Sequence, residues 1–213
     1  SGVEAWAVLL EEEAVVALYN TARFTALSLL LATALGLAHA LAARRVLWLR
    51  ALVFLPFMVS PVMVAFGLLL LYPAWVGSFS LLVAAYALLA YPFVAKSIAS
   101  ALDSMPEHYL DAARSLGASP WRAFVRVTLP LLAPALRRGM AFAAATAVGE
   151  FAVTLFLSRP EWATLTTLIY QHLGRPGDAN RSAALVLACV LMGLALLAFV
   201  LIETKPSEDR DHA

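Results

Sequence analysis

Three long stretches of this chain contain no Asp, Glu, Lys or Arg, and they restrict the fold more than any other feature of the sequence. They are residues 24–43, 51–95 and 182–202. A helix needs roughly 20 apolar residues to cross a bilayer. The middle stretch is long enough for two crossings, with Tyr72–Ser80 as the turn between them. A fourth region, Gly139–Leu157, is interrupted only by Glu150.

The composition agrees with a membrane protein, because only 14% of the residues are charged and the mean hydropathy is +0.83. A soluble domain would carry about a quarter charged residues. We therefore predict an all-α membrane protein with about five transmembrane helices. These spans are expected at residues 22–43, 47–71, 79–101, 134–157 and 182–202. Residues 1–20 are expected to form an outer-surface amphipathic segment, Asn20-Thr21 to cap the first span, and residues 204–213 to form a cytoplasmic tail.

The distribution of Lys and Arg predicts the orientation in the membrane, since cytoplasmic loops carry an excess of both. Eleven of the 15 basic residues fall on one side of the expected spans: Arg44, Arg45, Arg50, Lys96, Arg114, Arg122, Arg126, Arg137, Arg138, Lys205 and Arg210. The other four are Arg23, Arg159, Arg175 and Arg181. We therefore place the N-terminus outside, the C-terminus inside, and the protein in a bacterial-type cytoplasmic (inner) membrane.

A polar, basic island lies between the expected third and fourth spans and carries a spaced motif. Asp111-Ala112-Ala113 is followed by three residues and Gly117, and then, after nine residues, by Val127-Thr128-Leu129-Pro130. Pro106-Glu107 predicts a helix start and Gly117 a left-handed helix end. Ser119-Pro120 predicts a second helix start, and Leu129-Pro130 its end. The island therefore predicts a helix–turn–helix hairpin on the cytoplasmic side.

This spacing resembles the loop by which permease subunits of type I ATP-binding-cassette (ABC) importers bind their ATPase. The similarity extends from Thr21 to about Glu203 and includes Leu55-Pro56 with Pro61, and Tyr91-Pro92-Phe93. It implies the methionine-permease-like helical fold, with residues 21–203 as the permease domain and residues 103–132 as the coupling loop. The chain departs from the family motif at Asp111, where a Glu is usual.

The resemblance implies that Glu107–Leu116 is a coupling helix seated in a groove of a separate ATPase subunit. The residues implied in coupling are Glu107, Tyr109, Leu110, Asp111, Ala112, Ala113, Leu116, Gly117, Leu129 and Pro130. The chain has no G-x-x-x-x-G-K-[ST] phosphate loop. We therefore expect a permease subunit that is not itself an enzyme and holds no cofactor, with ATP bound by the partner. Further implied partners are an extracytoplasmic solute-binding protein, a second permease module (fused or homodimeric) and the lipid bilayer. Nucleic acid is not expected.

Glu150 is the one ionisable residue deep within an expected span, and an intramembrane carboxylate is by default a functional candidate. Together with Gly149, Pro61 and Pro92 it is a candidate for the translocation path. A carboxylate that only joins neighbouring helices is the alternative. The stretches Gly149–Pro160 and Thr164–Tyr170 resemble the ferric iron, thiamine and aminoethylphosphonate branch, in which two such modules are often fused, and the chain fits a C-terminal half.

An ionised Glu150 in the path would also repel an anion where little solvent screens the charge. The sequence therefore favours ferric iron or thiamine as cargo, with molybdate or sulfate as the alternative. A polytopic carrier outside the ABC class, or an intramembrane enzyme, is a more remote possibility. An enzyme should show clustered catalytic groups, and a proton-coupled carrier several membrane carboxylates. Neither pattern is present, and the lone Cys189 and four scattered histidines predict no metal site.

Overall fold

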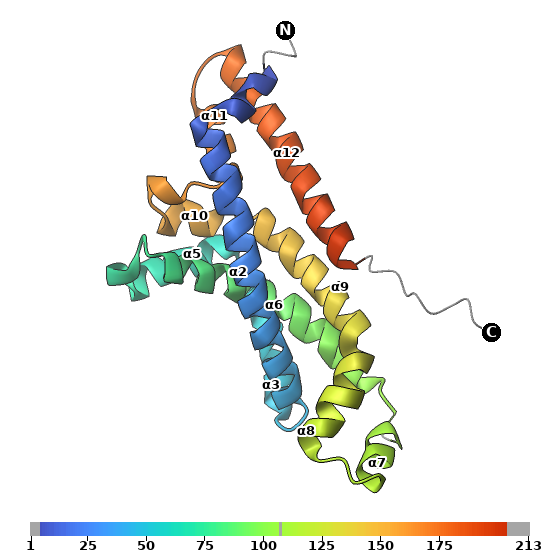
Figure 1. Ribbon diagram of the computed structural model, residues 1–213. Helices are drawn as coiled ribbons and strands as arrows, with labels where there is room; N and C mark the ends of the chain where they lie inside the picture. Colours follow the sequence, from blue (N-terminus) through green and yellow to red (C-terminus); the bar gives the residue numbers. More distant parts are fainter. Residues whose placement is uncertain (1–4, 107, 204–213) are drawn as a thin grey trace, which may run out of the picture.

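The computed structural model describes residues 5–106 and 108–203, and these residues form helices joined by short turns (Figure 1). In chain order the elements are η1 (Trp6–Leu10), α2 (Glu12–Ala43), α3 (Leu47–Leu52), α4 (Leu55–Met58), α5 (Pro61–Leu71), η2 (Pro73–Trp75), α6 (Phe79–Asp103), α7 (His108–Ser115), α8 (Pro120–Ala123), η3 (Phe124–Thr128), α9 (Leu129–Val148), α10 (Ala152–Leu157), η4 (Pro160–Trp162), α11 (Leu165–Gly174) and α12 (Asp178–Glu203). The predicted all-α fold class is confirmed.

Helix α2 begins well before the predicted first span. The short turn η1 leads directly into α2 at Glu12, so Asn20 and Thr21 lie inside the helix and the predicted cap there is wrong. Glu12 and Glu13 favour an early start because acidic side chains in a first turn interact well with the helix dipole. Asn20 instead donates from Nδ2 to the carbonyls of Glu161 and Ala163, at 3.0 and 2.9 Å.

The second predicted span, residues 47–71, is not one continuous helix. The chain forms α3 and α4 and then α5, and the two parts meet at a bend of 99°. Proline lacks an N–H donor and disfavours helical backbone at the residue before it. Pro61 therefore lies at the first position of α5, behind the cap Ser60, rather than inside a helix.

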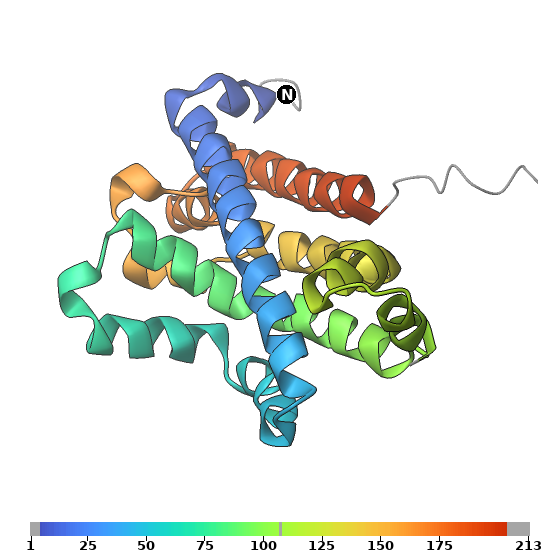
Figure 2. The same ribbon diagram turned by 60° about the horizontal axis from the view of Figure 1, so that its bottom comes forward.

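The fourth predicted span, residues 134–157, is also divided. Helix α9 ends at Val148, Gly149–Phe151 leave the helical path, and α10 starts at Ala152. Within the described residues α2, α6 and α12 are long and apolar enough to cross a membrane, and the bent pair α3–α4 with α5 makes a fourth if it counts as one span. Helix α9, which carries Arg137 and Arg138, runs beside α6 as the remaining long helix (Figures 1 and 2).

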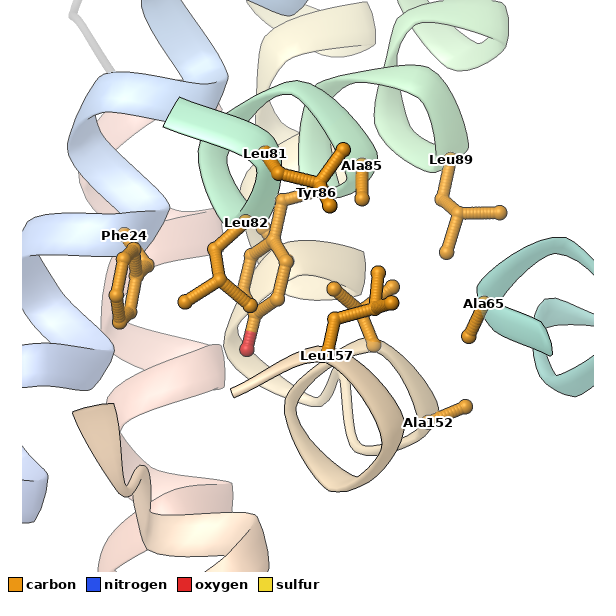
Figure 3. Close-up of a cluster of buried hydrophobic side chains, with 11 residues drawn as sticks. Phe24, Ala65, Leu81, Leu82, Ala85, Tyr86, Leu89, Ala152 and Leu157 are labelled. Atoms are coloured by element: carbon orange, nitrogen blue, oxygen red, sulfur yellow. The ribbon is translucent and has the colours of Figure 1, made fainter. Parts of the chain in front are cut away.

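Helices α2 and α9 both approach α6 closely at Val94. A Cβ at Gly36 of α2 would lie 2.7 Å from Val94 Cβ, and a Cβ at Gly139 of α9 would lie 2.8 Å from Val94 Cα. Small residues of this kind let helix backbones come together in membranes. Val94 itself is fully buried between them. A second cluster surrounds Tyr86, which points from α6 toward the segment carrying Leu157 (Figure 3).

Candidate coupling loop and translocation path

Helix α7 ends in the way that the motif predicts. Gly117 adopts φ +79°, in the left-handed region that favours glycine. The N–H of Ala118 donates to the carbonyl of Ala113 at 3.0 Å, and the N–H of Gly117 to that of Arg114 at 2.9 Å. These bonds satisfy carbonyls that a helix end leaves unpaired. Ser119 then caps α8 by accepting from the N–H of Arg122 at 3.4 Å, with Pro120 at the first position.

The side chains of α7 divide into buried and exposed groups. Ala113 is only 9% exposed, because α7 packs against α8 and η3. Tyr109 of α7 is 45% exposed and Leu116, directly after the helix, is 89% exposed, so two large apolar side chains face outward here. Asp111 pairs with Arg114 at 3.6 Å, an exposed contact that stabilises little. The motif residue Glu107 and the side chain of Leu110 lie outside the described residues.

The predicted helix end at Leu129-Pro130 is wrong. Helix α8 continues through η3, a π-helical turn, into α9, and the residues at both junctions have helical backbone angles. Pro130 explains the wider turn, because its ring lacks an N–H and would clash with the carbonyl four residues earlier. The second arm of the hairpin is therefore continuous with α9, while the first arm follows from α6. The hairpin is built on the two helices that pack side by side in the core.

The Glu150 side chain faces protein groups at the break between α9 and α10. It is 7% exposed, and its Oε1 accepts from the N–H of Val153 at 3.0 Å. This places the carboxylate at the start of α10, where backbone N–H groups lack helical partners. The carbonyl of Glu150 accepts from Thr166 Oγ1 at 2.9 Å and from the Tyr86 hydroxyl at 3.4 Å. These contacts make Glu150 a link between α6, α10 and α11.

The other candidates for the path are dispersed. Pro92 lies inside α6 and is buried, Pro61 begins α5 at the bend of the second span, and Gly149 ends α9. The structure does not bring these three together with Glu150 at one site. It does show that two of them, Pro61 and Gly149, mark the two breaks in long apolar segments.

Sequence reasoning missed the contacts that hold the segment between α10 and α12. Helix α11 carries a capping box in which Thr164 and Thr167 bond each other's backbone. The N–H of Leu165 donates to Thr21 Oγ1 at 3.0 Å, which attaches α11 to α2. The threonine-rich run was the available signal, since hydroxyl side chains favour helix starts. Also unforeseen was an ion pair from Arg50 of α3 to Asp103 of α6, at 2.9 Å.

The family is established by comparison with known proteins. The model of the binding-protein-dependent transport system inner membrane component family matches residues 21–204. The chain therefore belongs to this family of permease components and is a multi-pass protein of the bacterial inner membrane. The match includes both arms of the hairpin and all of the long helices from α6 onward.

Three curated relatives have the following similarity. The molybdenum transport system permease protein ModB of Haemophilus influenzae is 33% identical over 114 residues, which are 52% of this chain and 50% of that protein. The sulfate transport system permease protein CysT of Escherichia coli is 31% identical over 134 residues, which are 62% of this chain and 47% of that protein. PhnV of Salmonella typhimurium, named for 2-aminoethylphosphonate transport, is 30% identical over 160 residues, which are 73% of this chain and 59% of that protein. The matched part of this chain thus spans about half to three fifths of each relative.

A solved structure shows the same fold. The MetNI methionine ABC transporter, in an inward-facing conformation, aligns with a TM-score of 0.70 at 18% identity, covering 88% of this chain and 94% of that chain. The predicted methionine-permease-like bundle is therefore confirmed at the level of the fold.

Proposed function

We propose that this chain is a translocation subunit of an ATP-driven, binding-protein-dependent importer, and that a separate subunit binds ATP. The observation that carries the proposal is helix α7 with its glycine-terminated end, which leaves Tyr109 on the helix and Leu116 directly after it exposed. Exposed apolar side chains on a short helix are typical of a helix that binds in a groove. Membership of the permease family supports the view that this groove belongs to an ATPase subunit.

The hairpin connects the proposed ATPase contact to both α6 and α9. Helix α6 leads into α7, and α7 packs on α8 and η3, which continue into α9. A rigid-body shift of α7 would therefore move the cytoplasmic ends of α6 and α9 together. Closure of two ATPase subunits is a movement of this kind, since domains rotate as units about their interfaces. Leu129 and Pro130 contribute through the π-helical turn that joins the hairpin to α9.

The cargo that we propose is a small oxyanion such as molybdate, sulfate or a phosphonate. The preference for ferric iron or thiamine rested partly on an ionised Glu150 in the path, and that side chain caps α10 instead. The names of the three curated relatives refer to molybdenum, sulfate and 2-aminoethylphosphonate. Ferric iron and thiamine remain cargoes to be compared in the same assay.

The remaining partners are a solute-binding protein outside and a second permease module in the membrane. Helices η4 and α11 form the outer segment on which the binding protein would dock, near residues 158–181. The family description names dependence on a binding protein, which supports this assignment. A second module, fused or separate, would complete the translocation path.

Uptake by proteoliposomes tests the proposal. The full-length permease is reconstituted with its ATPase and binding protein, and ATP-dependent uptake of labelled molybdate, sulfate, iron and thiamine is measured. Gly117→Val should abolish uptake, because a β-branched residue is strained at φ +79°, whereas Gly117→Asn should retain most of it. A Cβ at Gly117 would meet nothing within 4 Å, so both variants should fold.

Equal uptake by the Val and Asn variants would reject the role of the helix end. Uptake without added ATP would reject the importer class itself. Uptake of iron or thiamine alone would overturn the choice of cargo and leave the permease assignment in place.

A further inference from the structure

We propose an oxyanion-binding site on the cytoplasmic side of the path, formed by Lys96 of α6 and Arg138 of α9 with the serines between them. This inference rests on the proposed import of an oxyanion and locates where the anion would be held before release. It begins from a cavity of about 600 Å³ between α6 and α9. That volume exceeds what a hydrated anion needs, since each water occupies about 30 Å³.

The polar groups that line this cavity are cationic or neutral. They are Lys96 and Arg138 with the hydroxyls of Ser97, Ser100 and Ser104. No Asp or Glu of the described chain lines the cavity. A neighbouring cavity of about 280 Å³ shares Lys96 and Ser100 with this one and also includes Asp103, which pairs with Arg50 at 2.9 Å, whereas Arg138 lines the larger cavity alone. The larger cavity therefore carries a positive charge that its own walls do not neutralise.

Neither cation has an ion-pair partner in residues 5–106 and 108–203. The Lys96 Nζ lies 5.5 Å from the centre of the Phe54 ring, a cation–π contact that leaves its charge in place. A charged side chain within a membrane helix is costly unless it faces water or a counter-ion. An anion in this cavity would supply that counter-ion to both side chains.

The polar residues form one exposed face of α6. Lys96, Ser100 and Ser104 are four residues apart and are all exposed. Such spacing places them on one side of a helix. The Ser97 hydroxyl donates to the carbonyl of Ala135 at 2.7 Å, so it is already used to join α6 to α9. The Ser100 hydroxyl has no hydrogen bond to the described protein and is free to donate to a ligand.

An aromatic layer lies next to the site on its outer side. Phe57, Phe93, Phe142 and Phe199 form a chain of ring contacts across α4, α6, α9 and α12, with successive centroids 5.0, 6.3 and 5.1 Å apart. Phe93 precedes Lys96 by one helical turn on the inward-running α6, and Phe142 follows Arg138 by one turn on the outward-running α9. An anion that passes this apolar layer would meet the two cations directly beyond it.

The chemistry fits a tetrahedral oxyanion. An arginine guanidinium can donate two parallel hydrogen bonds to adjacent oxygens, and a lysine ammonium and a serine hydroxyl can donate to others. The same groups could bind the phosphate of a lipid headgroup, and the test below separates the two sources, but the cargo that we propose is itself an oxyanion on its way to the cytoplasm. We therefore assign the site to the free oxyanion.

Chemical modification tests the site without relying on transport. Ser100→Cys is introduced in a Cys189→Ala background, and inside-out vesicles of the assembled transporter are treated with methanethiosulfonate reagents. The negatively charged sulfonate reagent should react roughly tenfold faster than the positively charged trimethylammonium reagent, as expected beside two cations. Millimolar molybdate or sulfate should slow the reaction severalfold, and chloride should not. The preference and the protection should both disappear in Lys96→Met/Arg138→Met, but persist in Arg137→Met, a neighbour that does not line the cavity.

Three outcomes would overturn the proposal: equal rates for the two reagents, no protection by either oxyanion, or protection that depends on anionic lipid in the vesicles rather than on added anion. Uptake measured on the same variants separates this inference from the proposed function. Absence of the charge preference in the Ser100→Cys protein with both cations present, together with intact ATP-dependent uptake, would reject the site alone. Absence of uptake in the unmodified transporter would reject the function while leaving the modification result to stand.

Discussion

At the scale of single residues, Glu150 shows what could be predicted from the sequence and what could not. The sequence indicates that Glu150 is a lone carboxylate in an apolar stretch, and such a group needs polar partners within the protein. The direction of its side chain depends on the break at Gly149–Phe151, which the hydrophobic pattern does not show because both sides of the break are equally apolar. Once the helix ends there, the nearest unpaired donors are the first N–H groups of α10, and the carboxylate binds one of them.

Substitutions at Glu150 separate a structural role from a role in the path. Glu150→Gln keeps an oxygen that can accept from the N–H of Val153, so stability and uptake should stay near those of the parent protein. Glu150→Leu leaves that donor without a partner and should lower the free energy of unfolding by about 1–3 kcal/mol. Thermal unfolding in detergent and uptake in proteoliposomes measure the two effects. Loss of uptake in the Gln variant at normal stability would show that the charge itself acts in transport.

At the scale of helices, the motif predicted the turn between the two arms of the hairpin correctly, but it did not predict that the second arm continues into α9. Gly117 and Ser119-Pro120 have local physical preferences, and the structure confirms both. Pro130 was interpreted as a helix end by the same local logic, yet η3 widens by one residue and the helix continues. The two broken spans were missed for a related reason, since a run of apolar residues fixes burial in the membrane but not whether the backbone stays helical.

The close contacts at Val94 make a prediction about helix packing. Gly36→Leu and Gly139→Leu should each destabilise the protein by roughly 1–3 kcal/mol or more, because a side chain at either position would meet Val94. Gly193→Leu is the matched control, since a Cβ there would meet nothing within 4 Å. Thermal unfolding of the three variants in one detergent gives the comparison. Equal stability of all three would contradict the tight packing of α2 and α9 on α6.

At the scale of the whole molecule, the orientation in the membrane remains a prediction from the bias in Lys and Arg. Two positions with exposed side chains serve to test it, Glu161 in η4 and Arg122 in α8. In a Cys189→Ala background, a cysteine at 161 should react with an impermeant thiol reagent added outside intact cells. A cysteine at 122 should react only in inverted vesicles. Reaction of both from the same side would reject the proposed orientation.

The central claim is that helix α7 joins this permease to an ATPase, and site-specific crosslinking tests it most directly. A photoreactive amino acid is placed at Leu116, which is 89% exposed directly after α7, and, as a control, at Leu201, which is 66% exposed on α12. In membranes that contain the assembled transporter, we predict a crosslink to the ATPase subunit from position 116 and none from position 201. A transporter that assembles and transports normally but gives no ATPase crosslink from position 116 would contradict the account.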